Sequence, residues 1–339
     1  MKISILIPCY NEELMIERCV FSCHNQTRLP DEIIIVNDCS TDKTLDILKR
    51  FDKNVRVITT PNNMGNKSYA QEYGLQFVSG DVFITTDGDT VLDKNFVERI
   101  EKDMEDNSIA AVSGYVRSFK YNWITACRAL DYTIGQNIDK LAASYLNFIL
   151  VVPGAAGAFR TSIFKNEITF SHDTLTEDLD FTYTLNYLGY KIKYDRKAIC
   201  YTQDPFNLYS YIHQMRRWYG GGWQNLIKHF RIPDKPGMAF ELILTYVDAL
   251  IFSFLIFLMP IISLYITIWF WGIYSLIILA LCFYASLKER RLEFLFALPC
   301  YAFLKFINAW IFLEQFFKEV VFKKREIVWY KPERAKMNN

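Results

Sequence analysis

Short apolar runs rich in β-branched residues alternate with amphipathic stretches over the first 120 residues of the chain. Apolar runs of about four to eight residues are typical of buried strands, whereas a period of about 3.6 residues is typical of helices. The predicted strands are Ile3–Ile7, Glu32–Val36, Val55–Thr59, Val82–Thr86 and Ala110–Val116. The predicted helices are Glu12–Asn25, Asp42–Phe51, Asn66–Ser79 and Asn95–Glu105. Repeated βαβ units of this kind predict an α/β fold with a mostly parallel, doubly wound sheet.

A second pattern begins near residue 249, where charged residues disappear. The 39 residues Ala249–Leu287 contain no Asp, Glu, Lys, Arg or His. About 20 helical residues cross the hydrocarbon core of a bilayer, so this run predicts two membrane helices within residues 243–287. The aromatic sequence 269–272 is the expected interfacial turn between them. The alternative is a buried hairpin in the core of a large soluble domain.

A third apolar segment, residues 292–317, is interrupted by three charged residues and a proline. It is expected either to span the bilayer or to lie in the interface as an amphipathic helix. The sequence 288–291 before it is basic, and the tail 318–339 carries seven Lys and Arg residues against three Glu. Because cytoplasmic loops are enriched in basic residues, a cytoplasmic N-terminal domain predicts an even number of crossings.

Composition narrows the function classes. The chain has 339 residues, 51% hydrophobic and 16% aromatic, with 38 basic and 37 acidic side chains and a formal net charge of +1. The apolar content excludes a disordered chain, and the balanced charge argues against a general nucleic-acid binder. The N-terminal apolar run is too short for a secretory signal. We expect an integral membrane protein with a cytoplasmic domain at 1–235, membrane helices at 236–317 and a basic tail at 318–339.

Polar residues follow three of the predicted strands, at 8–12, 37–42 and 86–89. Ligands of doubly wound sheets bind beyond the carboxyl ends of the strands, which makes these residues candidates for a site. The chain has no glycine-rich dinucleotide fingerprint and no P-loop motif. Asp87 and Asp89, on either side of a glycine, are suited to hold Mg²⁺ or Mn²⁺, which also binds the oxygens of a diphosphate. A surface turn is the alternative for this tripeptide.

Three further motifs lie downstream. The loop Val152–Phe159 consists mainly of small residues, which let a flat ligand approach the backbone. Thr176–Asp178 is an acidic cluster at the expected start of a helix, and Gln214–Trp218 lies on another helix. Arg suits phosphates, and an exposed Trp ring suits a sugar. His172 either completes a metal site or is a hydrogen-bonded structural residue.

In this order, these motifs resemble those of family 2 glycosyltransferases. The nearest pattern is the membrane-bound branch that contains cellulose, chitin, hyaluronan and poly-N-acetylglucosamine synthases. The resemblance covers about residues 1–225 and continues into the apolar segment. It implies a GT-A fold, with a Rossmann-like sheet followed by transmembrane or interfacial helices at the C-terminal side.

The resemblance implies a site for a nucleotide sugar, with UDP as the expected nucleotide. Asp38 would contact the base, Lys67 would lie near the nucleotide and Arg217 would contact the diphosphate. Asp87 would lie near the ribose and the metal, and Asp89 would bind the metal, Mg²⁺ or Mn²⁺. The end of the first strand would line the same pocket through Pro8, Tyr10, Asn11 and Glu12.

The same resemblance describes the acceptor side. Asp178 would be the catalytic base, removing a proton from the acceptor hydroxyl, which then attacks the anomeric carbon opposite the leaving diphosphate. The acceptor, a glycan or a lipid-linked molecule, would be contacted by Gly157, Glu177, Gln214 and Trp218. The implied reaction is an inverting, metal-dependent transfer of a hexose or N-acetylhexosamine in polysaccharide or glycoconjugate synthesis.

The chain departs from the family pattern at two places. Asn37 stands where many relatives carry Asp, so the base contact would depend on Asp38. Only two clear spans follow the catalytic domain, whereas long-chain synthases thread their polymer through a larger helical channel. A short product, a lipid-linked acceptor, or an oligomer or partner subunit that builds an export channel therefore stays open. The tail sequence 329–334 resembles a C-terminal gating segment of this branch.

Two other functions stay open. A polyprenyl-phosphate glycosyltransferase shares the early motifs and a short membrane tail, although Gln214-x-x-Arg217-Trp218 is typical of the polymer branch. A catalytically inactive subunit that binds a nucleotide or scaffolds a synthase belongs to another class. Such a subunit has no physical need for two metal-binding carboxylates, a base and a phosphate-binding Arg together.

Overall fold

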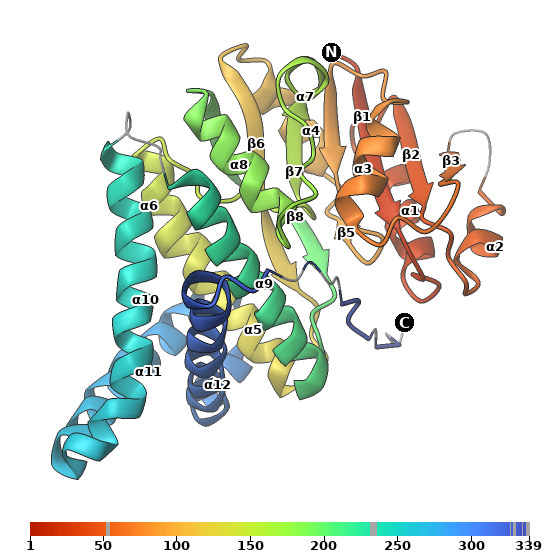
Figure 1. Ribbon diagram of the computed structural model, residues 1–339. Helices are drawn as coiled ribbons and strands as arrows, with labels where there is room; N and C mark the ends of the chain where they lie inside the picture. The colour runs from red at the N-terminus through yellow and green to blue at the C-terminus, as the bar shows by residue number, and fades with distance from the viewer. Residues whose placement is uncertain (52–54, 231–235, 326, 328–329, 334, 337–339) are drawn as a thin grey trace. The chain divides into compact units, whose positions relative to one another are not determined.

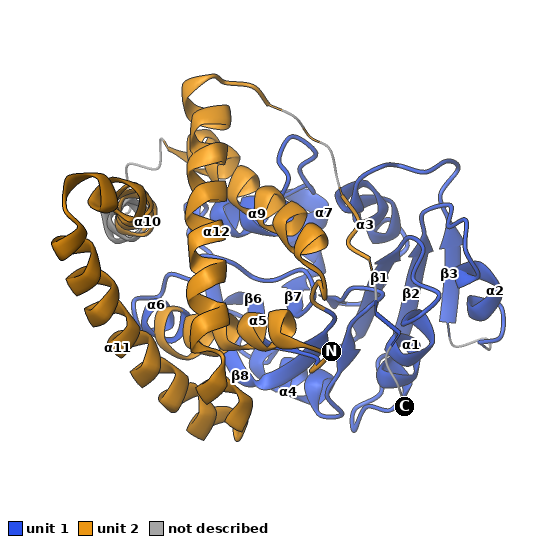
Figure 2. Cartoon of the chain, turned by 90° about the horizontal axis from the view of Figure 1, so that it is seen from below, with its two compact units in different colours: residues 1–119, 140–203, 334–339 blue, residues 120–139, 204–333 orange. Residues whose placement is uncertain are grey.

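A computed structural model describes residues 1–51, 55–230, 236–325, 327, 330–333 and 335–336, with the backbone alone for 236–241 and 243. The chain divides into two compact units, coloured separately in Figure 2. The first unit comprises residues 1–119, 140–203 and 334–339, and the second comprises 120–139 and 204–333.

The first unit is built on a sheet whose described strands follow the order β3-β2-β1-β4-β7-β6-β8-β5 (Figure 1). These strands are β1 (Ile3–Cys9), β2 (Glu32–Asn37), β3 (Val55–Thr59), β4 (Val82–Thr85), β5 (Val91–Leu92), β6 (Ile109–Ser118), β7 (Gly157–Arg160) and β8 (Lys191–Thr202). The pairings from β3 to β4 are parallel, whereas β7 runs antiparallel to both β4 and β6. β8 is parallel to β6 and antiparallel to β5. The expected α/β fold is confirmed, with a sheet that is parallel from β3 to β4 and mixed beyond.

The helices of the first unit connect these strands. They are α1 (Ile16–His24), α2 (Thr44–Leu48), α3 (Lys67–Leu75), α4 (Phe96–Met104), α6 (Lys140–Tyr145), α7 (Thr161–Asn166) and α8 (Glu177–Tyr187). Every strand and helix predicted before residue 120 is present, with ends moved by a few residues. The first helix starts later than predicted, after a turn in which Met15 and Ile16 donate to the carbonyl of Glu12.

The core of the first unit lies on both sides of β1, which is buried at all of its positions. A strand paired on both edges and covered on both faces reads as a continuous apolar run, as this one does. α3 approaches the sheet closely at Gly74, where a Cβ atom would lie 2.5 Å from Leu6 Cδ1 and 2.5 Å from Val36 Cγ2. The close packing of α3 fixes its N-terminal residue, Lys67, at the carboxyl end of the strands.

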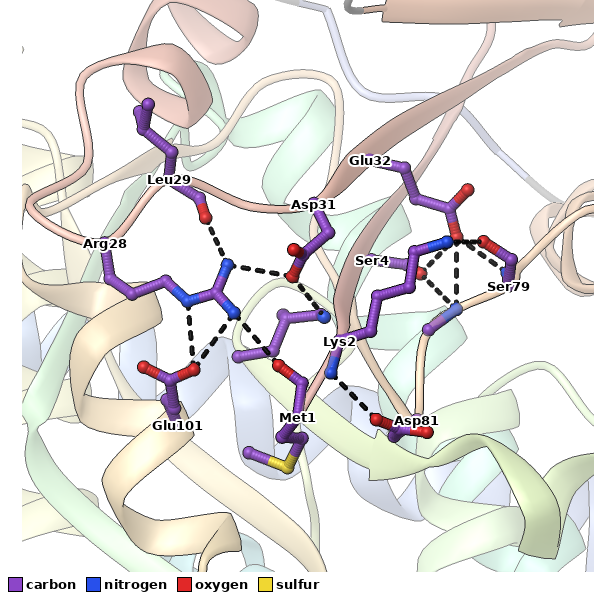
Figure 3. A network of polar contacts seen from close by, with 12 residues as sticks. Met1, Lys2, Ser4, Arg28, Leu29, Asp31, Glu32, Ser79, Asp81 and Glu101 are labelled. Atoms are coloured by element: carbon purple, nitrogen blue, oxygen red, sulfur yellow. Dashed lines mark hydrogen bonds and ion pairs between the residues drawn. The ribbon is translucent and has the colours of Figure 1, made fainter.

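The amino ends of β1 and β2 are closed by a network of charged groups (Figure 3). Asp31 Oδ2 accepts from the backbone N–H of Ile3 and pairs with Arg28, at 2.8 Å in each case. Arg28 also pairs with Glu101 at 3.0 Å, and Asp81 accepts from the backbone N–H of Lys2 at 2.8 Å. This network fixes the start of β1, and the motif residues follow the opposite ends of the strands.

The second unit consists of helices. They are α5 (Trp123–Ile134), η1 (Gly135–Asp139), α9 (Leu208–His229), α10 (Pro236–Ile262), α11 (Leu264–Glu289), η2 (Leu292–Phe296), α12 (Leu298–Phe316) and η3 (Phe317–Val321). The segments Leu244–Ile262 and Leu264–Glu289 are long and apolar enough to cross a membrane, and only 11% and 17% of their apolar windows are buried. A helix in the core of a soluble protein is mostly buried. These two helices are mostly exposed, so they do not fit the alternative of a buried hairpin.

The turn between the two apolar helices is not at 269–272, as predicted, but at Ser263. Ser263 has extended backbone angles, and its hydroxyl accepts from the N–H of Ile266 at 3.4 Å, so it caps α11. Residues 269–272 lie inside α11. A serine that satisfies a free N–H group is a stronger helix start than a run of aromatic residues, which continue a helix without difficulty.

The third apolar segment forms η2 and α12, and its polar residues are paired inside the second unit. Lys305 lies 3.0 Å from Asp131 of α5, Asn308 accepts from the hydroxyl of Tyr211 at 2.8 Å, and Glu314 pairs with Arg216 at 3.1 Å. Lys305 and Glu314 therefore bind α5 and α9, two of the helices against which α12 packs.

Candidate active site

The end of β1 is bonded to the end of β2. Asn11 has a φ of 54°, and its Oδ1 accepts from the N–H of Thr41 at 2.7 Å. The N–H of Asn11 donates to Ser40 Oγ at 2.9 Å, and that of Glu12 donates to Thr44 Oγ1 at 2.7 Å. The polar ends of the first two strands thus form one surface, with Pro8 and Tyr10 directly before Asn11.

Asp38 is buried, and the loop after β3 holds it. Its Oδ1 accepts from Thr60 Oγ1 at 2.8 Å and from the N–H of Met64 at 2.9 Å. The side chain of Asn63 donates to the backbone carbonyl of Asp38 at 3.0 Å. Both bonds to the carboxylate use Oδ1, which fixes the orientation of this side chain. Asn37, the departure from the family pattern, instead accepts from the N–H of Ser40 at 3.2 Å.

The Asp87-Gly88-Asp89 tripeptide follows β4 and packs against the end of β1. A Cβ atom at Gly88 would lie 3.0 Å from Glu12 Cγ and 3.1 Å from Cys9 Cβ, so this glycine lets the tripeptide approach β1 closely. The Asp89 side chain is buried and accepts from Thr90 Oγ1 at 3.3 Å. Asp87 is the more exposed of the two carboxylates.

Lys67 joins three motifs that lie far apart in the sequence. Its ammonium group pairs with Asp87 Oδ1 and lies 3.6 Å from Glu177 Oε1. It also lies against the small-residue loop, since a Cβ atom at Gly154 would be 2.6 Å from Lys67 Nζ. Burial by itself would lower the pKa of Lys67, but the Asp87 and Glu177 carboxylates outweigh it and raise the pKa above its usual value. A positive charge therefore sits permanently between the two acidic motifs.

Asp178 lies in the first turn of α8, where the helix starts after Thr176. Its Oδ1 accepts from the N–H of Leu179 at 2.9 Å, a bond favoured at a helix N-terminus. Thr182, one turn later, donates to the carbonyl of Asp178 at 2.6 Å and accepts from the N–H of Val152 at 3.0 Å. The small-residue loop and the acidic cluster are thus fastened together.

Lys140 is a functional candidate that the sequence analysis missed. Its Nζ lies 5.2 Å from the centre of the Tyr194 ring, and its charge interacts with the Asp178 carboxylate. Burial lowers the pKa of Lys140 to about 7, against the opposing effect of Asp178. No motif marks this lysine in the sequence, because its neighbourhood arises only when α6 packs beside β8.

Two further residues of the first unit have clear structural roles. Gly157 pairs with Thr85 in the sheet, and a Cβ atom there would lie 2.8 Å from the Phe159 ring, which explains the glycine by packing. His172 is the hydrogen-bonded structural residue of the two alternatives: its ring nitrogens lie 3.0 Å from Ser68 Oγ and 2.8 Å from Glu72 Oε2.

Gln214, Arg217 and Trp218 lie on α9 in the second unit. Gln214 is buried, and its Oε1 accepts no hydrogen bond from the described part of the chain. The Trp218 ring lies 4.7 Å from the guanidinium carbon of Arg128. The structure thus gathers Lys67, Asp87, Gly154 and Glu177 in the first unit, and the meeting of that group with the α9 residues stays a prediction.

Part of the tail that resembles a gating segment also packs on α9. The Tyr330 ring stacks on His213 with centroids 4.5 Å apart, and Asn207 donates to Glu333 at 3.1 Å. Trp329 and Arg334 lie outside the described residues.

Among the described residues, no group of three or more His, Cys, Asp or Glu side chains could hold a metal by itself. Asp87 and Asp89 nevertheless fit a cation that takes its remaining ligands from a substrate, since Mg²⁺ commonly binds one or two carboxylates together with phosphates. Lys67 pairs with Asp87, so a cation held there would share this carboxylate with an ammonium group.

Comparisons with known proteins agree with this geometry. Residues 4–166 match the family model described as "Glycosyl transferase family 2". The poly-beta-1,6-N-acetyl-D-glucosamine synthase of Staphylococcus epidermidis is 28% identical over 232 residues, which are 67% of this chain and 56% of that protein. The chain therefore spans little more than half the length of this curated relative.

Solved structures extend the likeness to the fold. The mannosyltransferase PcManGT of Pyrobaculum calidifontis, in complex with GDP-Man and Mn²⁺, is 17% identical, with a TM-score of 0.67 over 96% of this chain and 88% of that one. S. aureus TarS 1–349 in complex with UDP-GlcNAc is 17% identical, with a TM-score of 0.57 over 94% of this chain and 92% of that one. Residues 4–166 thus match glycosyl transferase family 2, and the first unit has the GT-A fold.

Proposed function

We propose that this protein is a membrane-bound, inverting glycosyltransferase that moves a sugar from a UDP-linked donor to a hydroxyl of a glycan or a lipid-linked acceptor. The observation that carries the proposal is the position of Lys67, whose ammonium group joins Asp87 of the donor motif to Glu177, the neighbour of the proposed base. Asp87, which is suited to the donor diphosphate and its cation, therefore lies close to Glu177 on the proposed acceptor side.

The donor we propose is a UDP-linked N-acetylhexosamine. The relative from S. epidermidis is a synthase of an N-acetyl-D-glucosamine polymer, and TarS was solved with UDP-GlcNAc. PcManGT was solved with GDP-Man, so a guanosine donor is the competitor that a screen must include. In this proposal Asp38 contacts the base, and Pro8, Tyr10, Asn11 and Glu12 line the nucleotide pocket.

The base we propose is Asp178. It takes the proton of the acceptor hydroxyl as the hydroxyl oxygen bonds to the anomeric carbon, and the bond from that carbon to the diphosphate oxygen breaks on the opposite face. The charges of Lys67 and Lys140 both interact with the Asp178 carboxylate. Gly157, Glu177, Gln214 and Trp218 form the acceptor side, and Arg217 contacts the diphosphate.

A divalent cation, Mg²⁺ or Mn²⁺, would be held by Asp87 and Asp89 together with the donor. When bound, it would neutralise negative charge on the departing diphosphate. The Mn²⁺ in the PcManGT complex supports this assignment.

We place α10 and α11 across the bilayer and α12 at its cytoplasmic side. α10 and α11 expose most of their large apolar side chains, whereas the charged residues of α12 pair with α5 and α9. Two crossings return the basic sequence 288–291 to the side of the N-terminal domain, in agreement with the enrichment of basic residues in cytoplasmic loops.

The experiment is a donor screen on the purified full chain in detergent, which measures release of nucleoside diphosphate with and without Mn²⁺ or Mg²⁺. We expect release from a UDP-sugar that depends on the cation and on an added glycan or lipid acceptor. Asp178→Asn should lower the rate at least about 100-fold and leave donor affinity within about twofold, since only the proton transfer is lost. Asp46→Asn, on the exposed side of α2, is the matched control.

Each outcome separates the alternatives. Unchanged turnover in Asp178→Asn removes this residue as the base. A product that partitions into organic solvent with one sugar on a lipid phosphate identifies a polyprenyl-phosphate transferase. No release with any donor, together with retained nucleotide binding, identifies an inactive nucleotide-binding subunit.

A further inference from the structure

A neutral cluster of buried and partly buried charged side chains lies in the second unit beside α9. Arg128 of α5 is only 4% exposed, and its Nη1 lies 3.2 Å from Asp131 Oδ2. Its Nε lies 3.5 Å from Asp204 Oδ1. Lys305 is 3.0 Å from Asp131, so two cations face two carboxylates.

The cluster is extended by tyrosines that hold the carboxylates in place. The hydroxyl of Tyr301 donates to Asp131 at 2.6 Å, and that of Tyr132 donates to Asp204 at 3.3 Å. Charged groups withdrawn from water are costly unless they are paired and hydrogen-bonded, and such networks fix one arrangement of their members. Arg128 is therefore fixed in position from two sides.

The fixed guanidinium group lies on an aromatic ring of the acceptor motif. The guanidinium carbon of Arg128 is 4.7 Å from the centre of the Trp218 ring and 4.8 Å from that of Tyr132. A planar guanidinium group stacks on an indole and attracts its electron-rich face, an interaction that an ammonium group makes less specifically. Trp218 is partly exposed and also packs against the apolar cluster of the second unit, so Arg128 contacts its ring without enclosing it.

We propose that Arg128 is a positioning residue for Trp218, holding the indole in the orientation in which it receives the acceptor. The inference rests on the proposed function for the role of Trp218, and on the geometry of the second unit alone for the role of Arg128. Asp131 and Asp204 orient Arg128, and Lys305 ties the cluster to α12.

The test uses the full chain in detergent with Arg128→Lys, which keeps the positive charge beside Asp131 and Asp204 and removes the planar group. We expect the acceptor KM to rise about fivefold or more, the donor KM to stay within about twofold and kcat at saturating acceptor to change little. The matched control is Arg216→Lys. Arg216 lies on α9, two residues before Trp218, and pairs with Glu314 of α12.

A double-mutant cycle separates positioning from a general packing role. In a Trp218→Leu background, Arg128→Lys should have no further effect on the acceptor KM, because the ring that it positions is gone. Additive effects of the two substitutions, or an unchanged acceptor KM in Arg128→Lys, would overturn the proposal.

A second readout does not depend on catalysis. The chain has seven Trp residues, and 5-fluorotryptophan labelling gives each a ¹⁹F resonance, of which the one lost in Trp218→Phe belongs to position 218. We expect that resonance to shift or broaden in Arg128→Lys and to stay unchanged in Arg216→Lys. A resonance unmoved in Arg128→Lys rejects the positioning role, whereas a moved resonance in a protein without transferase activity rejects only the proposed function.

Discussion

At the scale of single residues, two lysines set the charge around the proposed base. Lys67 pairs with the carboxylates of two motifs and keeps its charge, whereas burial lowers the pKa of Lys140 to about 7. The two therefore respond differently to pH. Only Lys140 changes charge near neutrality, and it does so close to Asp178.

Lys140→Met should stabilise the protein more at pH 6 than at pH 9. The unfolded lysine has a pKa of about 10.4, so between about pH 7 and pH 10 the unfolded state binds more protons and the free energy of unfolding of the wild type rises with pH. Below pH 7 the folded state bears the full cost of a buried charge, which methionine removes. Between pH 9 and pH 6, the free energy of unfolding of Lys140→Met relative to the wild type should rise by on the order of 2 kcal/mol.

The measurement is the midpoint of thermal unfolding of both proteins across this pH range. Lys49→Met, which removes an exposed lysine paired with Asp46 on α2, is the control. If the difference in unfolding midpoint between Lys140→Met and the wild type does not vary with pH, the lowered pKa of Lys140 is contradicted.

At the scale of elements, the position of Lys67 depends on how closely α3 packs on the sheet. Gly74 leaves no room for a methyl group between the fully buried side chains of Leu6 and Val36. The first three strands and their helices could be predicted because each is a local pattern of apolar residues. β7 and β8 could not. The last residues of the predicted small-residue loop, from Gly157 on, belong to β7, and the place of this short strand between β4 and β6 depends on partners far away in the sequence.

Gly74→Ala should destabilise the first unit by about 1–3 kcal/mol, because overpacking outweighs the better helix propensity of alanine. Thermal unfolding monitored by circular dichroism measures the loss. Gly135→Ala is the matched control, since a Cβ atom there would meet only Asp139 Oδ2, at 3.9 Å, and the backbone is already helical. Equal stability of the two variants would show that α3 can move away from the sheet.

At the scale of the whole molecule, apolar surface is concentrated on α10 and α11. Among the exposed side chains of these helices, Leu276 is 69% exposed near the middle of α11. Exposed apolar surface of this extent marks an interaction site, and the bilayer that we propose would cover it.

Leu276→Arg should reduce stable membrane insertion, because an Arg at the centre of a spanning helix costs about 3 kcal/mol. The fraction of protein that resists extraction by alkaline carbonate should fall several-fold. Phe21→Arg, on an exposed position of α1, should leave that fraction unchanged. Full resistance of the Leu276→Arg protein would mean that this face of α11 is not in contact with lipid.

The sequence by itself determined the α/β class of the first unit, the apolar helices and the candidate motifs, because all of these are local patterns of residue type. It placed the turn between the apolar helices wrongly, since one capping hydroxyl at Ser263 decided it. Only the tertiary structure decided that Lys67 joins Asp87 to Glu177, that Lys140 lies near Asp178 and that Arg128 lies on Trp218. These contacts join residues from separate elements, and packing brings them together at distances that spacing along the chain does not encode.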